Sequence, residues 1–171
     1  MRSEVEAVVE RLRRGRSMAR LRVIDDAEVD RPAGPETLPD VVVEPYRWLL
    51  ERVGSGVRLT QAGYLPPAIV TEAMAALGWQ AKWIGKHNRE DQTLPILDLR
   101  ESAQRLGLLR KNRGQLLSTK VGRTLVKDPP GLWWHLADRL PDGRSEPERQ
   151  AGVLYLLTAA AGRPLDRKLL A

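Results

Sequence analysis

The chain has 171 residues without a single cysteine, which excludes disulfides, thiolate zinc sites and cysteine nucleophiles. His87 and His135 are its two histidines, and no familiar ligand spacing surrounds them, so we expect neither a metal ion nor another cofactor. Its 28 basic and 22 acidic residues give a net charge of +6, which permits binding to polyanions without requiring it. No apolar run approaches the roughly 20 residues that cross a bilayer, and the N-terminus lacks the apolar centre of a signal peptide. We therefore expect a soluble, cytoplasmic protein with no membrane partner.

Charge divides the chain into zones. Residues 1–22 hold seven basic and three acidic residues around an apolar stripe at helical spacing, which predicts a basic amphipathic helix. Residues 23–44 hold seven acidic residues, one basic residue and three prolines, which predicts a linker. This linker either shields the neighbouring basic surfaces or forms a solvated arm. We expect a folded domain over 45–127 and a C-terminal helical extension over 128–171 that packs on it.

The folded part begins with short elements. Residues 45–53 predict a helix, because Pro45 suits a first helical turn and apolar residues recur near one face. Residues 57–60 predict a strand. Residues 66–77 predict a second helix that ends at a glycine.

The next elements form a helix and a hairpin. Residues 79–93 show no clear periodicity and are interpreted as irregular, whereas residues 95–106 predict a helix. The inner face of this helix comprises Ile96, Leu99, Ala103 and Leu106, and its outer face comprises Asp98, Arg100, Glu101, Gln104 and Arg105. Residues 108–111 and 115–119 predict two strands joined by a turn at Asn112-Arg113-Gly114.

Two helices are expected near the C-terminus, over 132–140 and 146–161. Trp133 and Trp134 point about 100° apart on the first, so we expect one in the core and the other near a surface, beside a hydrogen-bonded His135. The second helix has almost no charge beyond its first turn and should be buried in the domain or in a partner chain. The predicted fold class is mainly α with a small β-hairpin.

Residues 99–125, LRESAQRLGLLRKNRGQLLSTKVGRTL, run from a helix through a Gly-Leu corner into a basic hairpin and then through a Thr-x-x-Gly turn. With the preceding helix, strand and helix, they resemble the winged helix-turn-helix fold of bacterial transcriptional regulators over roughly residues 45–126. The stretch YRWLLERVGSGVRLTQAGYLPP is similar to uncharacterised actinobacterial proteins of plasmids or mobile elements. One departure is that about seventeen residues separate helices 66–77 and 95–106, where a tight helix-turn-helix has only a few.

The resemblance implies roles for a basic cluster in which eight basic residues face one acidic residue over 100–127. The helix would direct its arginines and glutamine into a major groove, and the hairpin tip would meet phosphates or the minor groove. The expected nucleic-acid-binding residues are Arg100, Gln104, Arg105, Arg110, Lys111, Arg113, Lys120 and Arg123. They predict a non-enzymatic protein that binds double-stranded DNA, in a regulatory or mobile-element-associated role. The alternative is that the hairpin charges only protect a sheet edge from strand addition.

Two further hypotheses stay open. Residues 86–91 (KHNRED) contain an imidazole, two carboxylates and two cations, which are the materials of acid-base catalysis, or else form a structural, salt-bridged loop. The protein could also be an interaction module without nucleic-acid binding. In that case the charge-poor C-terminal helix or the N-terminal arm would form a homodimer.

Overall fold

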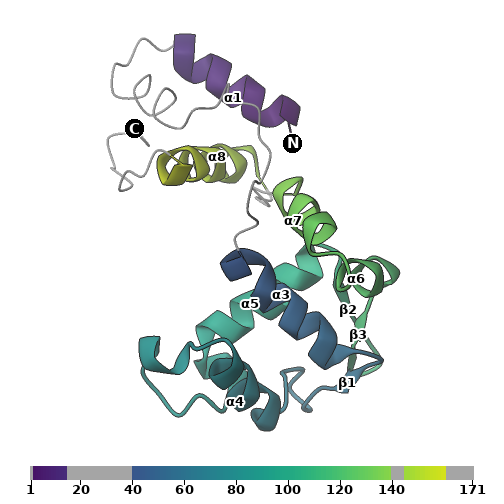
Figure 1. Ribbon diagram of the computed structural model, residues 1–171. Helices are drawn as coiled ribbons and strands as arrows, with labels where there is room; N and C mark the ends of the chain where they lie inside the picture. The colour runs from purple at the N-terminus through teal and green to yellow at the C-terminus, as the bar shows by residue number, and fades with distance from the viewer. Residues whose placement is uncertain (1, 15–39, 140–144, 161–171) are drawn as a thin grey trace. The chain divides into compact units, whose positions relative to one another are not determined.

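The computed structural model describes residues 2–14, 40–139 and 145–160 (Figure 1). Contacts divide the chain into two units, one of residues 37–136 and one that joins residues 1–36 with 137–171. The fold is mainly helical with a small three-stranded antiparallel sheet, which confirms the predicted class. In the described ranges, no helix has both the length and the apolar character needed to cross a membrane.

The unit of residues 37–136 contains most of the elements. In chain order they are α3 (Asp40–Val53), β1 (Val57–Arg58), α4 (Pro67–Ala76), η1 (Gln80–Lys82), η2 (Glu90–Gln92), α5 (Leu94–Arg105), β2 (Leu109–Asn112), β3 (Gln115–Ser118), α6 (Lys120–Leu125) and α7 (Pro129–Ala137). Figure 1 shows α3 crossing α5 and leading into the sheet, with α4 beside them. The strands follow the order β1-β3-β2, so the first strand pairs with the last.

Helix α3 begins at Asp40, inside the stretch expected to be a linker, and Pro45 lies within it. The prediction that the helix starts at Pro45 is therefore wrong. Pro45 is the sixth residue of this helix, beyond the first turn whose N–H groups have no partner, so the helix lacks the hydrogen bond from position 45 to the carbonyl of position 41. The reason for the earlier start is Val43, which is 3% exposed and belongs to the core.

The core of this unit draws on every long helix and on the inner face of the sheet. Its most buried large side chains include Leu49, Leu65, Met74, Ile96, Leu108, Leu116 and Leu132. The four residues expected on the inner face of α5 are all buried, which confirms that part of the helical prediction. Leu132 and Leu136 bring α7 into the same core, so this helix packs on the unit as an integral element.

The segment between α4 and α5 folds around one buried carboxylate. It contains the short helices η1 and η2, and Glu90 of η2 is 1% exposed. Glu90 accepts a hydrogen bond from the Leu65 backbone N–H at 2.7 Å and pairs with Arg100 of α5. A segment that the sequence predicts as irregular is thus anchored to both neighbouring elements.

The two tryptophans of α7 differ in their exposure to solvent, as predicted. Trp133 packs partly buried against the core, whereas Trp134 is 43% exposed. The His135 ring nitrogen Nε2 lies 2.8 Å from the Leu106 carbonyl oxygen, so this histidine is hydrogen-bonded, as expected.

The other unit contains α1 (Arg2–Arg14) and α8 (Glu146–Ala160), which contact each other. Val9 of α1 and Val153 of α8 are buried. The C-terminal helix was expected to be buried in the domain or in a partner chain; within this chain Leu157 is buried, while Tyr155 is 59% exposed and Leu156 is 38% exposed. The predicted linker covered residues 23–44: residues 23–39 lie outside the described residues, and residues 40–44 are helical instead.

Candidate nucleic-acid interface

The tip of the hairpin is a two-residue turn at Arg113-Gly114. Asn112 and Gln115 form the last pair of the β2–β3 ladder, and the two residues between them have positive φ angles of 47° and 75°. Positive φ at both central residues is the signature of a type I′ turn, whose twist matches that of a hairpin. Arginine is an unfavourable residue for a left-handed conformation, which normally favours glycine or asparagine. The turn therefore holds an exposed arginine at its outermost point at a conformational cost.

The register of the sheet separates its side chains into two faces. Residues directly opposite in an antiparallel pair share a face, and neighbours along a strand alternate. Arg58 lies opposite Gln115, and Gln115 lies opposite Asn112, so one polar row crosses all three strands. Arg110 lies opposite Leu117 on the same side. We call this surface the outer face: it consists of Arg58, Arg110, Asn112, Gln115 and Leu117.

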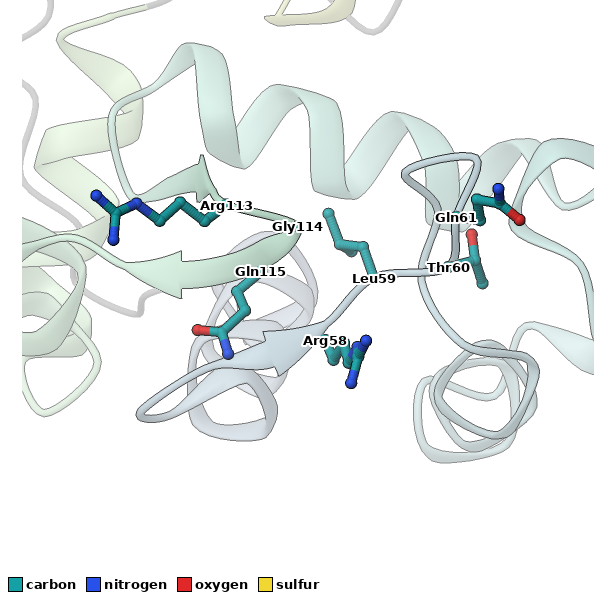
Figure 2. A pocket seen from close by; sticks show the side chains of 7 residues that line it. All are labelled: Arg58, Leu59, Thr60, Gln61, Arg113, Gly114 and Gln115. Carbon is teal, nitrogen blue, oxygen red and sulfur yellow. The ribbon is translucent and has the colours of Figure 1, made fainter.

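The outer face continues into an open pocket at the end of β1. The pocket has a volume of about 570 Å³ and is lined by Arg58, Leu59, Thr60, Gln61, Arg113, Gly114 and Gln115. The Leu59 backbone N–H donates to the Gly114 carbonyl at 2.9 Å, which joins the chain after β1 to the hairpin tip. In Figure 2, Leu59 points to one side of the strand, whereas Arg58 and Gln115 lie on the other, and Arg113 extends away from β1.

The cations of the outer face lack acidic neighbours. Between residues 102 and 127 the chain has seven basic residues and no acidic one. Arg58, Arg110 and Arg113 are exposed, and none of them has an ion pair or a side-chain hydrogen bond with any residue in the described part of the chain. The outer face and the tip together therefore present three unneutralised guanidinium groups and two amides, which suits contact with phosphate oxygens.

Lys111 lies on the inner side of the sheet, opposite Leu116, although it follows Arg110 directly. Its Nζ donates to the Gly63 carbonyl oxygen at 2.9 Å and so ties the hairpin to the turn after β1. Burial lowers the pKa of Lys111 most, and the positive charge of Arg100 lowers it further. This lysine has a structural contact, in contrast to the free arginine beside it.

The base of the hairpin is fixed by the start of α6. The Thr119 hydroxyl accepts a hydrogen bond from the Gly122 N–H at 3.0 Å and caps the helix. Gly122 is buried, and a Cβ atom there would lie 2.3 Å from the Leu108 carbonyl oxygen. Arg123 donates to the Ser118 carbonyl at 2.7 Å, while Lys120 is exposed. Of the two predicted cations after the hairpin, Arg123 is partly engaged in holding its base.

The expectation that Arg100 points outward into a groove is wrong. Arg100 is 2% exposed, its Nε lies 2.5 Å from a carboxylate oxygen of Glu90, and its Nη1 donates to the Gln104 side-chain oxygen at 2.6 Å. A buried guanidinium needs such partners, because an unpaired charge is costly to bury. Gln104 is half-buried and committed to the same network.

The exposed side of α5 is more acidic than the helical pattern suggests. Asp98, Glu101 and Arg105 are exposed on it, and Arg105 lies 4.0 Å from the Glu101 carboxylate. Of the three helix residues predicted to read bases, Arg100 is buried, Gln104 is half-buried, and Arg105 is exposed beside the opposite charge of Glu101.

The polar loop over 86–91 directs its groups in different directions. The His87 ring contacts the Trp83 carbonyl oxygen at 2.7 Å, Arg89 pairs with Asp91 at 2.9 Å, and Glu90 is buried. The geometry matches the hypothesis of a structural, salt-bridged loop. The described residues include no group of three or more histidines and carboxylates that could hold a metal ion.

Comparisons with known proteins add no family. The chain matches no protein-family model, no curated protein and no solved structure. The outer face therefore has to be interpreted from its own chemistry.

Three polar residues of the outer face were not predicted from the sequence: Arg58, Asn112 and Gln115. Arg58 lies far from the hairpin in the chain, and only the pairing of β1 with β3 brings it beside Gln115. The sequence does contain one indication that Arg58 is exposed: side chains alternate along a strand, and Arg58 follows Val57, which is buried. That pattern predicts an exposed arginine but not its partner strand.

Proposed function

We propose that this protein binds double-stranded DNA through the outer face and the hairpin tip, without catalysing a reaction on it. The observation that carries the proposal is the set of three exposed arginines, Arg58 and Arg110 on the outer face and Arg113 at the tip, which make no ion pair with any described residue. Each phosphate that such a group neutralises releases counterions, which favours binding to a polyanion. Because β1 and β2 are the two edge strands of the sheet, Arg58 and Arg110 also suit protection of a strand edge, and the binding experiment below separates the two roles.

The element order supports the same proposal. Apart from the short helices η1 and η2, the order from α3 to β3 is helix, strand, helix, helix, strand, turn and strand, which is the order on which the resemblance to winged helix-turn-helix regulators rests. By that analogy we assign the protein a regulatory or mobile-element-associated role in the cytoplasm. The analogy concerns the fold, and the function rests on the arginines.

Fluorescence anisotropy with a labelled random-sequence duplex tests the proposal over a series of salt concentrations. Three phosphate contacts would give a slope of about −2.7 in a plot of log K against log salt concentration. The variant Arg110→Gln with Arg113→Asn should weaken binding by roughly tenfold or more and reduce the slope by about 1.8.

The matched control is Lys86→Glu, which also removes two units of positive charge from an exposed position in the loop between η1 and η2. This control should bind nearly as the wild type does. The proposal fails if the wild type does not bind duplex at low salt, or if the arginine variant binds as well as the control.

A second candidate function is a protein-interaction module, favoured by the exposed Tyr155 and Leu156 of α8. Apolar side chains on the surface of a helix pair mark sites of association between chains. The homodimer expected through α8 or the N-terminal arm is the simplest such assembly. Light scattering after size exclusion tests it, and Tyr155→Glu with Leu156→Glu should convert a dimer to a monomer. A wild-type monomer at high micromolar concentration excludes this homodimer.

A further inference from the structure

We infer that α5 stays out of the major groove, and that the protein holds a duplex by its sugar-phosphate backbone irrespective of base sequence. The inference rests on the proposed function and specifies the class of ligand. It differs from the arrangement that a winged-helix resemblance implies, in which a helix reads base edges. Three observations on α5 and the outer face support it.

The side chains of α5 that could read bases are committed elsewhere. A guanidinium recognises guanine, and a carboxamide recognises adenine, through paired hydrogen bonds from groups that are free to reach the base edge. Arg100 instead donates to Glu90 and Gln104 inside the protein and is 2% exposed. Gln104 uses its side-chain oxygen to accept from Arg100. Releasing Arg100 would leave the Glu90 carboxylate without its charged partner, and releasing Gln104 would remove a hydrogen-bond acceptor of Arg100.

The surface that α5 does present would repel a groove lined by phosphates. Asp98 and Glu101 are exposed carboxylates one helical turn apart, and Arg105 is drawn toward Glu101 at 4.0 Å. Bringing this face into a major groove would place two anions between two phosphate backbones. The sequence-reading position of the helix is therefore electrostatically unfavourable.

The outer face is basic, in contrast to the exposed side of α5, which carries Asp98 and Glu101. Arg58, Arg110 and Arg113 supply charge, while Asn112 and Gln115 supply amide donors between them. These groups match the donors that contact phosphate and sugar oxygens, which position a protein on a duplex without specifying sequence. The outer face contains no aromatic side chain, so it offers no platform on which unpaired bases could stack. A duplex backbone is the ligand that fits it.

The decisive experiment compares two duplexes of identical sequence. One carries ordinary cytosines, and the other carries glucosylated 5-hydroxymethylcytosines, which fill the major groove with bulky, uncharged groups. The wild-type protein should bind both with dissociation constants that agree within about twofold, because its contacts lie on the backbone. A loss of tenfold or more on the glucosylated duplex overturns the inference and leaves duplex binding itself intact. Absence of binding to either duplex overturns both the inference and the proposed function.

Matched variants locate the contact. Arg58→Gln should weaken binding several-fold and reduce the salt slope by about 0.9, because it removes one phosphate contact. Its control, Lys86→Gln, removes the same charge from an exposed position in the loop between η1 and η2 and should leave the slope unchanged. Asp98→Asn with Glu101→Gln should change affinity by less than about twofold, because α5 lies away from the phosphates. A marked gain in affinity from this pair would place α5 against the duplex and contradict the inference.

Discussion

The carboxylate of Glu90 lies 2.5 Å from the Nε atom of Arg100, and neither side chain has more than a trace of exposure to solvent. The second oxygen of Glu90 accepts the Leu65 backbone N–H, and a second nitrogen of Arg100 donates to Gln104. A buried ion pair adds little net stability compared with apolar residues, but removing one partner leaves an uncompensated charge. This pair fixes the segment between α4 and α5 and withdraws Arg100 from the surface.

Glu90→Gln should destabilise the protein by about 3–5 kcal/mol, because Arg100 keeps its charge and loses its counterion. Urea unfolding followed by tryptophan fluorescence measures the change. Glu72→Gln is the control, since Glu72 pairs with Arg52 at 2.7 Å on the surface and its loss should cost less than about 1 kcal/mol. If Glu90→Gln does not fold, Glu90→Leu with Arg100→Met should restore folding. Equal, small costs for the Glu90 and Glu72 variants would contradict the prediction.

Gly122→Ala should destabilise the protein, although alanine is the better helix former by about 1 kcal/mol. The new Cβ would meet the Leu108 carbonyl oxygen at 2.3 Å and Leu50 Cδ2 at 2.9 Å, so backbone would have to move. Overpacking of this kind costs about 1–3 kcal/mol. Thermal unfolding is the measurement, with Thr124→Ala at an exposed position of the same helix as the control. A stabilised Gly122→Ala variant would show that α6 can shift away from the hairpin.

Arg113→Asn should separate stability from binding. Asparagine tolerates the left-handed conformation that Arg113 adopts at φ 47°, so the variant should be more stable by up to about 1 kcal/mol. The same change removes a cation from the tip and should weaken duplex binding. Arg110→Asn, at an extended position of β2, should weaken binding without the gain in stability. A loss of stability in Arg113→Asn would mean that the arginine side chain supports the turn.

Lys111 should lose its proton at a lower pH than an ordinary lysine. Burial and then the nearby charge of Arg100 disfavour the ammonium form and lower the pKa of this group. The folded state therefore disfavours the protonated amine, and the contribution of Lys111 to stability increases as the pH rises through its lowered pKa. Reductive methylation with ¹³C-formaldehyde follows the titration by NMR, and the Lys111→Arg variant assigns the signal. A midpoint at or above the ordinary value would contradict the prediction.

The elements with strong local patterns could be predicted from the sequence. The spacing of Ile96, Leu99, Ala103 and Leu106 identified both α5 and its buried face. The hairpin was predicted with a turn at Asn112-Arg113-Gly114, and the structure shortens this turn to Arg113-Gly114 by placing Asn112 in β2. The predicted bounds of β3 and α8 matched closely. In each case the signal lies within a few neighbouring residues, where periodicity and turn chemistry act directly.

The candidate site was predicted less well, because its geometry depends on contacts between distant segments. The helical pattern leaves Arg100 outside, and its burial follows from Glu90 in a segment without clear periodicity. Arg58 joins the interface only through the pairing of β1 with β3. Alternation predicts that Arg110 and Lys111 face opposite sides, but only the burial of Leu116 opposite Lys111 shows which side faces the core.

The two-residue turn at the hairpin tip sets the register of β2 against β3, and the register determines which basic side chains lie on the outer face of the sheet. A shift of β2 by one residue relative to β3 would exchange the faces of the strand, because side chains alternate with a period of two. Lys111 would then move to the outer face and lose its hydrogen bond to the Gly63 carbonyl oxygen, and Arg110 would move to the inner side. An insertion or deletion at Arg113-Gly114 that shifted the register would therefore change which basic side chain of β2 lies on the outer face, although the charged residues of the strand would stay the same. The conformation of two residues thus controls the polarity of a whole face.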